Sequence, residues 1–184
     1  MDYTLFVIQL LNGLQLGILL FLVASGLTLV FGILDFVNLA HGSVYMLGAF
    51  ICASLTFALG NFVYALLISL PIVAVIGYGF ERLIARPLYE RDHLDHVLGT
   101  FGAILVIDTL AHMIWGPAGI AIPIPAALDG QTQLAPDIIV PTFRLAIITA
   151  GLIAAAGLYW LVNHTRTGML IRAGASNRTM VTAL

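Results

Sequence analysis

A short polar segment interrupts a long apolar part of the sequence. Asp35 is the only Asp, Glu, Lys or Arg among residues 3–80. Asn38 and His41 follow it closely, and apolar runs flank the group on both sides. Polar groups at membrane depth are costly, so they usually face a protein interior or a water-filled path. The pattern predicts a polar helix break near residues 35–42 and is typical of proteins that move solutes.

Asn38 and His41 are spaced three apart, so on a helix they would share a face. Beside a helix break they could line a path, because broken helices expose backbone groups that bind ammonium and carboxylate groups. Alternatively, they fasten neighbouring helices by hydrogen bonds without touching a solute. Gly42 adds a point where the helix can break or pack closely. We expect no metal at His41, because no second His or Cys stands at ligand spacing nearby.

Other ionisable groups in or beside apolar runs have two readings each. Asp108 and His112 share a helix face, either as a polar element of a path or as an intrahelical hydrogen bond. Asp35 is expected at an interfacial helix end rather than as a pathway charge, because an unpaired midplane carboxylate is expensive. We assign a further acidic and histidine group to a solvated loop rather than to a metal site: Asp92, His93, Asp95 and His96.

The composition identifies an integral membrane protein. Of the 184 residues, 61% are hydrophobic and 9% are charged, whereas a soluble domain carries about a quarter charged residues. A net charge of −2 argues against a nucleic-acid partner, and one cysteine gives no disulfide framework. The start has no positively charged leader, so we expect the first apolar run to be retained.

Five apolar runs are long enough to cross a bilayer, which takes about 20 residues. The first, residues 4–34, is either one tilted helix or a helix followed by a re-entrant half. The remaining four cover residues 39–59, 62–80, 97–115 and 145–162. The segment 116–143 is too rich in Pro and Gly for a regular helix and is expected to lie against the protein. We predict an all-α, polytopic fold.

Arginine placement orients the spans, because cytoplasmic loops are enriched in Lys and Arg. The chain has no lysine, and six of its seven arginines fall in residues 81–96 and 164–184. We expect both segments in the cytoplasm and residues 116–143 outside. Five full crossings would put the amino terminus outside, and a re-entrant half in the first run would put it inside.

Three parts of the sequence together resemble the permease subunits of branched-chain amino-acid ABC importers. Residues 26–50 resemble the early family signature, with its Asn-x-Ala-His-Gly core at Asn38, Ala40, His41 and Gly42. The second part, similar to a cytoplasmic loop and the next helix, is Arg86–Pro87–Leu88 followed by Thr100–Phe101–Gly102. The third part, similar to the loop that meets the ATPase, is Thr165–Gly168 with Arg172–Ala173.

The resemblance implies one half of the channel of an ATP-driven importer in the bacterial inner membrane, with leucine, isoleucine or valine as substrate. Its partners would be a second homologous permease, two ATP-binding subunits, an extracytoplasmic binding protein and the lipid bilayer. The permease itself would need no cofactor or metal. Members of the family continue for several more spans, so we interpret residues 1–184 as a single permease domain from the amino-terminal part.

Other functions remain open. The family is close to urea and amide permeases, so the substrate could also be one of these or another amino acid. A secondary transporter or channel would work without ATPases. An intramembrane enzyme is disfavoured, because no nucleophile–base arrangement, phosphate loop or HExxH motif is present.

The tail, residues 165–184, is expected to form an amphipathic helix. Its stripe at helical spacing consists of Met169, Ala173, Ser176, Met180 and Leu184. Such a helix docks in a groove on a partner or lies on the membrane surface, and the resemblance favours docking to an ATPase. The residues assigned to this contact are Arg166, Gly168, Arg172, Ala173, Asn177 and Arg178.

Overall fold

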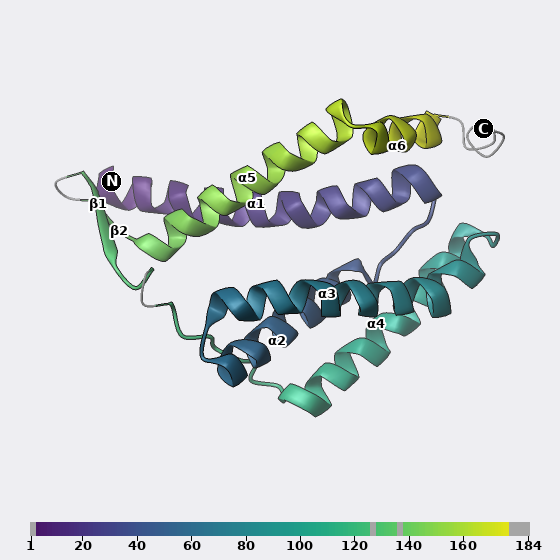
Figure 1. Cartoon of the computed structure of the whole chain (residues 1–184), viewed down its shortest axis with the longest axis horizontal. Helices are drawn as coiled ribbons and strands as arrows, with labels where there is room; N and C mark the ends of the chain where they lie inside the picture. Colours follow the sequence, from purple (N-terminus) through teal and green to yellow (C-terminus); the bar gives the residue numbers. More distant parts are fainter. Residues whose placement is uncertain (1–2, 126–127, 136–137, 177–184) are drawn as a thin grey trace. The chain divides into compact units, whose positions relative to one another are not determined.

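The computed structural model describes residues 3–125, 128–135 and 138–176 (Figure 1). In these residues five helices are long and apolar enough to cross a membrane, which confirms the predicted all-α, polytopic fold. They are α1 (Tyr3–Leu34), α2 (His41–Leu59), α3 (Phe62–Phe80), α4 (His93–Trp115) and α5 (Thr142–His164). A shorter helix, α6 (Arg166–Ser176), follows α5.

The first apolar run forms one unbroken helix. Helix α1 has 32 residues and is about 48 Å long at a rise of 1.5 Å per residue. This length exceeds the roughly 30 Å of a bilayer core, so the helix must tilt or extend beyond it. The alternative of a re-entrant half within residues 4–34 is therefore wrong.

The segment 81–96 is not the solvated loop that we expected. A π-helical turn (Glu81–Ala85) and a 3-10 turn (Arg86–Leu88) continue directly from α3, and α4 already begins at His93. The prediction of a loop rested only on the many charged and histidine residues near position 93. Helix α5 likewise extends beyond the predicted residues 145–162 at both ends.

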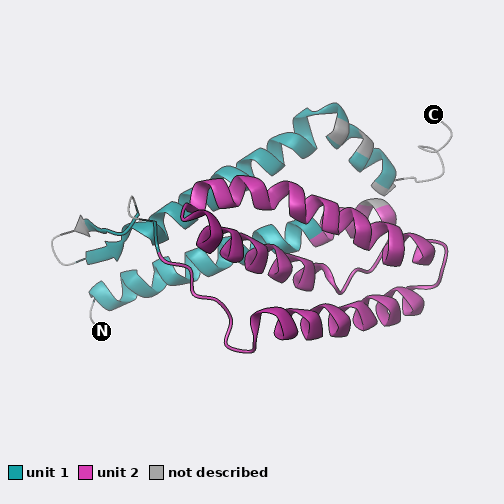
Figure 2. Ribbon diagram, turned by 60° about the horizontal axis from the view of Figure 1, so that its bottom comes forward, with its two compact units in different colours: residues 1–26, 124–184 teal, residues 27–123 magenta. Residues whose placement is uncertain are grey.

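Contacts within the chain group it into two compact units, residues 1–26 with 124–184 and residues 27–123 (Figure 2). In the second unit, α2 and α3 form a hairpin that turns at Gly60 and Asn61. Gly60 ends α2 with a φ of 63°, and the Asn61 side chain accepts the Val63 amide at 2.9 Å. At the far end of α4, Trp115 donates to Ser54 Oγ at 2.7 Å.

In the first unit, α1 and α5 meet at a small residue. Gly151 of α5 is buried, and a Cβ built there would collide with the Ile18 side chain of α1. A small residue at this position lets the two helix backbones approach closely. Ahead of α5, β1 (Gln131–Ala135) and β2 (Ile138–Pro141) form an antiparallel hairpin with Gln131 opposite Pro141. The sequence did not predict this hairpin.

Candidate functional site

The break between α1 and α2 covers Asp35–Ala40, which are not helical. Asp35 adopts a φ of 51°, a left-handed conformation that costs energy for residues other than glycine. The predicted break near residues 35–42 is confirmed. Asn38, however, precedes the start of α2. The prediction that Asn38 and His41 share a helix face is therefore wrong. The His41 amide instead donates to the Asn38 carbonyl across a turn, at 3.4 Å.

The break runs along α4. Four contacts occur in the same order along both segments: Asp35 with His93, Phe36 with His96, Leu39 with Thr100, and Ser43 with Asp108. At a rise of 1.5 Å per residue, Thr100 and Asp108 lie roughly 10 and 22 Å from the start of α4. Helix α2 therefore begins beside the middle of α4 rather than beside its end.

Burial against α4 covers Phe36 and Ala40 of this non-helical segment. Exposed backbone polar groups are costly in lipid, so irregular backbone there must be buried in protein or line a watery cavity. The Leu39 amide donates to Thr100 Oγ1 at 3.3 Å, and this hydroxyl donates to the His96 carbonyl at 2.7 Å. Thr100 is fully buried. One hydroxyl thus connects the break to the backbone of α4.

His96 is the centre of a buried cluster that the sequence reading missed. Its side chain is 3% exposed, and Nε2 lies 2.8 Å from the Leu88 carbonyl oxygen. Because a carbonyl can only accept, Nε2 carries the proton. The Phe36 ring, 1% exposed, lies 4.8 Å from the His96 ring and 5.4 Å from the Tyr89 ring. The expected solvated position of His96 is therefore wrong.

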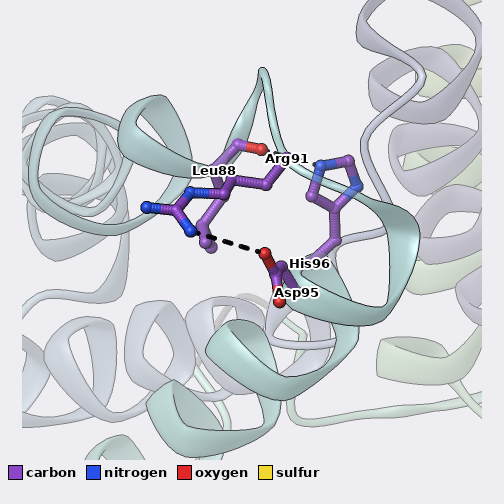
Figure 3. A network of polar contacts seen from close by, with 4 residues as sticks. All are labelled: Leu88, Arg91, Asp95 and His96. Carbon is purple, nitrogen blue, oxygen red and sulfur yellow. Dashed lines mark hydrogen bonds and ion pairs between the residues drawn. The ribbon is translucent and has the colours of Figure 1, made fainter.

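Arg91 and Asp95 form an ion pair at the edge of this cluster. Figure 3 shows the pair, at 3.8 Å, next to Leu88 and His96. The Leu88 carbonyl also accepts the Arg91 amide at 2.9 Å, which closes the turn before α4. In the described part of the chain no group of three His, Cys, Asp or Glu residues could hold a metal ion.

Two buried polar atoms near the break have no hydrogen-bond partner among the described residues: Asn38 Oδ1 and His96 Nδ1. With its proton on Nε2, His96 presents a lone pair at Nδ1. Both atoms are therefore acceptors without a donor. Buried polar atoms in folded proteins nearly always have a partner, so such atoms mark a place for water or a ligand.

Asp108 is bonded to α2 rather than to its own helix. Ser43 Oγ donates to Asp108 Oδ1 at 3.2 Å, whereas the His112 side chain is exposed. The intrahelical Asp108–His112 hydrogen bond is therefore wrong. Ser43 was not predicted, although it is the only hydroxyl in the first turn of α2. Asp35 lies directly after α1 with 68% of its side chain exposed, as expected of a residue at a helix end.

The corner between α5 and α6 is held by its own hydrogen bonds. Thr165 Oγ1 donates to the Leu161 carbonyl at 2.5 Å and accepts the Gly168 amide at 3.1 Å. The Arg172 guanidinium donates to the Val162 carbonyl at 2.6 Å. It also donates to the Asn163 side chain at 3.3 Å. These residues, Leu161–Arg172, form what we call the elbow.

Gly168 is required at the elbow. A Cβ built on it would collide with the carbonyl oxygens of Leu161 and Val162, which are backbone atoms of the last turn of α5. Glycine at position 168 therefore lets the chain turn sharply after α5. Arg166 and Ala173 of α6 are exposed. Asn177 and Arg178 lie outside the described residues.

A family model described as branched-chain amino acid transport system / permease component matches residues 9–184. The chain belongs to this family. With five helices that could cross a membrane, it is a multi-pass protein of the bacterial inner membrane. The resemblance read from the sequence is confirmed.

Individual relatives are similar at low identity. BraD of Pseudomonas aeruginosa, a high-affinity branched-chain amino acid transport system permease protein, is 27% identical over 187 residues. That match covers 96% of this chain and 61% of BraD. LivH of Escherichia coli K12, with the same description, is 26% identical over 200 residues, covering 100% of this chain and 63% of LivH. The chain thus spans less than two thirds of these relatives, and no solved structure matches it.

Proposed function

We propose that the protein is the membrane-spanning permease subunit of an ATP-driven importer for leucine, isoleucine and valine. The observation that carries this proposal is the family match over residues 9–184. BraD and LivH, which share the description, support the substrate class. A permease for urea, amides or other amino acids is the alternative within the same transporter class. An ATPase-independent transporter or channel is the alternative outside it.

The solute path would pass the break between α1 and α2. The residues that we assign to it are Asn38, His41, Gly42, Asp108 and His112. Two observations support this assignment: the non-helical backbone, and a buried acceptor on Asn38 that has no partner among the described residues. Unwound backbone beside half-helix ends is a recurring binding element in transporters.

The energy for transport would come from other subunits. Two ATP-binding partners would shift a pair of homologous permeases between outward-open and inward-open states, because each nucleotide state favours one of the two. An extracytoplasmic binding protein would deliver the substrate. The permease itself would hold no cofactor and catalyse no covalent reaction.

Helix α6 would transmit the motion of the ATPases. The elbow ties α6 to α5 through hydrogen bonds of Thr165 and Arg172, so a push on α6 would move α5 with it. The exposed residues Arg166, Ala173 and Met169 are available to a groove on the partner. Besides the contact with the ATPase that we assign to it, Arg172 would also hold the elbow closed, because its described hydrogen bonds are made to Val162 and Asn163 of α5.

The test is ATP-driven uptake of radiolabelled leucine by the complete protein, reconstituted with its ATPases and binding protein. We expect isoleucine and valine to compete with leucine, and urea and acetamide not to compete. Asn38→Leu and His41→Leu should each lower uptake while the complex still assembles, because both remove polar groups from the path.

Specific results would contradict the proposal. Uptake that is independent of ATP would identify a secondary transporter or channel, and competition by urea would identify an amide permease. Normal uptake by both leucine variants at normal expression would remove Asn38 and His41 from the path. Loss of assembly in either variant would instead support their role as helix fasteners.

A further inference from the structure

His96 connects the turn before α4 to the start of the break. Its ring nitrogen Nε2 donates to the Leu88 carbonyl of that turn, at 2.8 Å. The Phe36 ring, at the start of the break, lies 4.8 Å from the His96 ring between centroids. The two side chains are 1% and 3% exposed, respectively. One buried ring therefore contacts two segments that are far apart in the sequence.

The turn is a firm support for this ring contact. The Leu88 side chain packs on Gly99 of α4, where a built Cβ would lie 2.6 Å from Leu88 Cδ1. The ring of the next residue, Tyr89, is nearly perpendicular to the Phe36 ring at 5.4 Å. The Tyr89 hydroxyl donates to Glu81 Oε1 at 3.4 Å. Phe36 is thus held between two rings, and each ring has a hydrogen bond to the segment that joins α3 to α4.

A second anchor of the break follows one turn later along α4. The Thr100 hydroxyl accepts the Leu39 amide at 3.3 Å and donates to the His96 carbonyl at 2.7 Å. The side chain of His96 therefore contacts Phe36, and its backbone orients the hydroxyl that holds Leu39. Asn38 lies between these two anchored residues in the sequence. A chain fixed at both points cannot slide along α4 without breaking one of the two contacts.

We propose that His96 is a positioning residue for the solute path, acting through Phe36 to fix where Asn38 lies along α4. The inference rests on the proposed function, in which the break forms part of that path. A slip of one residue along a helix moves a contact by about 1.5 Å and rotates it by about 100°. Such a shift would carry Asn38 out of place, although His96 itself need not touch the solute.

The opposite end of α4 offers a matched control. Trp115 stacks on the Phe50 ring of α2 at 4.9 Å and donates its indole N–H to Ser54 Oγ at 2.7 Å. It therefore combines the same two contacts as His96, a ring against a phenylalanine and one N–H donor. These contacts join α4 to α2 rather than to the break. Leucine in place of either residue removes the ring and the donor and leaves an apolar side chain.

The first test measures amide hydrogen exchange at Leu39 in the complete permease assembled with its ATPases. We expect His96→Leu to speed this exchange about fivefold to thirtyfold, the factor for losing an interaction comparable with one hydrogen bond. Trp115→Leu should leave the rate within about twofold of the wild type, because distant sites act independently. His96→Gln keeps an N–H donor for Leu88 but lacks the ring. It should also speed the exchange, which keeps the test decisive if His96→Leu does not assemble.

The second test measures how much leucine the purified complex imports per ATP hydrolysed. Neither expression nor the folded fraction changes this ratio, so a purely structural role of His96 would leave it at the wild-type value. We expect His96→Leu to lower the ratio and Trp115→Leu to preserve it. Combining Phe36→Leu with His96→Leu should lower it no further than Phe36→Leu alone, because His96 acts through Phe36.

An unchanged exchange rate at Leu39 in both His96 variants would overturn the inference, and so would an equal change in Trp115→Leu. Faster exchange with an unchanged ratio would do the same, because His96 would then only stabilise the fold. A further fall of the ratio in the double variant would show that His96 does not act through Phe36. Absence of ATP-driven leucine uptake by the wild type would instead refute the proposed function, whereas the exchange rates test the link between His96 and the break without any transport.

Discussion

Substituting Gly168 with alanine should open the elbow between α5 and α6. The added Cβ would occupy the positions of the Leu161 and Val162 carbonyl oxygens. These are backbone atoms, so no side chain can rotate away to make room. Either the last turn of α5 distorts or α6 swings outward. Both movements break the hydrogen bonds that Thr165 and Arg172 make to those same carbonyls.

The cost can be bounded from the bonds that are lost. The Thr165 bond to Leu161 contributes about 1 kcal/mol. The Arg172 bond to Val162 is charge-assisted, but its exposure to solvent reduces it to about 1 kcal/mol or less. Alanine regains up to about 1 kcal/mol of helix propensity over glycine. Overpacking adds about 1–3 kcal/mol. We therefore expect the closed elbow to lose about 1–4 kcal/mol.

The assay is a distance measurement across the elbow. Spin labels at Leu152 of α5 and Met169 of α6, both exposed, should give one narrow distance distribution in the parent protein. In Gly168→Ala the distribution should broaden or shift. The matched control is Gly157→Ala in α5, where an added Cβ would meet nothing within 4 Å. Identical distributions for the parent, the control and Gly168→Ala would refute the steric reasoning.

Two further predictions concern orientation and the break. On a Cys52→Ala background in intact cells, an impermeant thiol reagent should label Gln131→Cys and leave Asp92→Cys unlabelled, because we expect the arginine-rich segments to face the cytoplasm. Equal labelling or the reverse would overturn that topology. Thr100→Val should lower the free energy of unfolding of the purified protein by about 1–3 kcal/mol, because the Leu39 amide loses its buried acceptor, Thr100 Oγ1. Thr100→Ser, which keeps the hydroxyl, should cost clearly less, and equal losses would contradict this account.

The sequence predicts the elements that depend on local pattern. Apolar runs of spanning length locate the five long helices, and Gly60–Asn61 marks the hairpin because a left-handed glycine ends α2 while Asn61 caps α3. The polar group at 35–42 locates the break for a similar reason: it holds the only Asp, Glu, Lys or Arg in residues 3–80. In each case the deciding chemistry lies within a few residues of the element.

The cluster around His96 could not be predicted in that way. His93, Asp95 and His96 stand together in a charged stretch that reads as solvated. His96 is buried because Phe36, far away in the sequence, packs against its ring. The Leu88 carbonyl supplies a hydrogen-bond partner that composition does not reveal. Ser43 and Asp108 are separated by a similar distance in the sequence, so their contact was equally hidden.

The break and the elbow differ in whether their polar groups have hydrogen-bond partners among the described residues. At the elbow, the Thr165 hydroxyl and the Arg172 guanidinium are engaged with the end of α5, which suits a joint that transmits force. At the break, Asn38 Oδ1 has no donor among the described residues, and Asp108 has no counter-charge there. Proteins tend to leave such polar groups unsatisfied at functional sites. This contrast supports the proposal that the solute contacts the break and that the elbow couples α6 to α5.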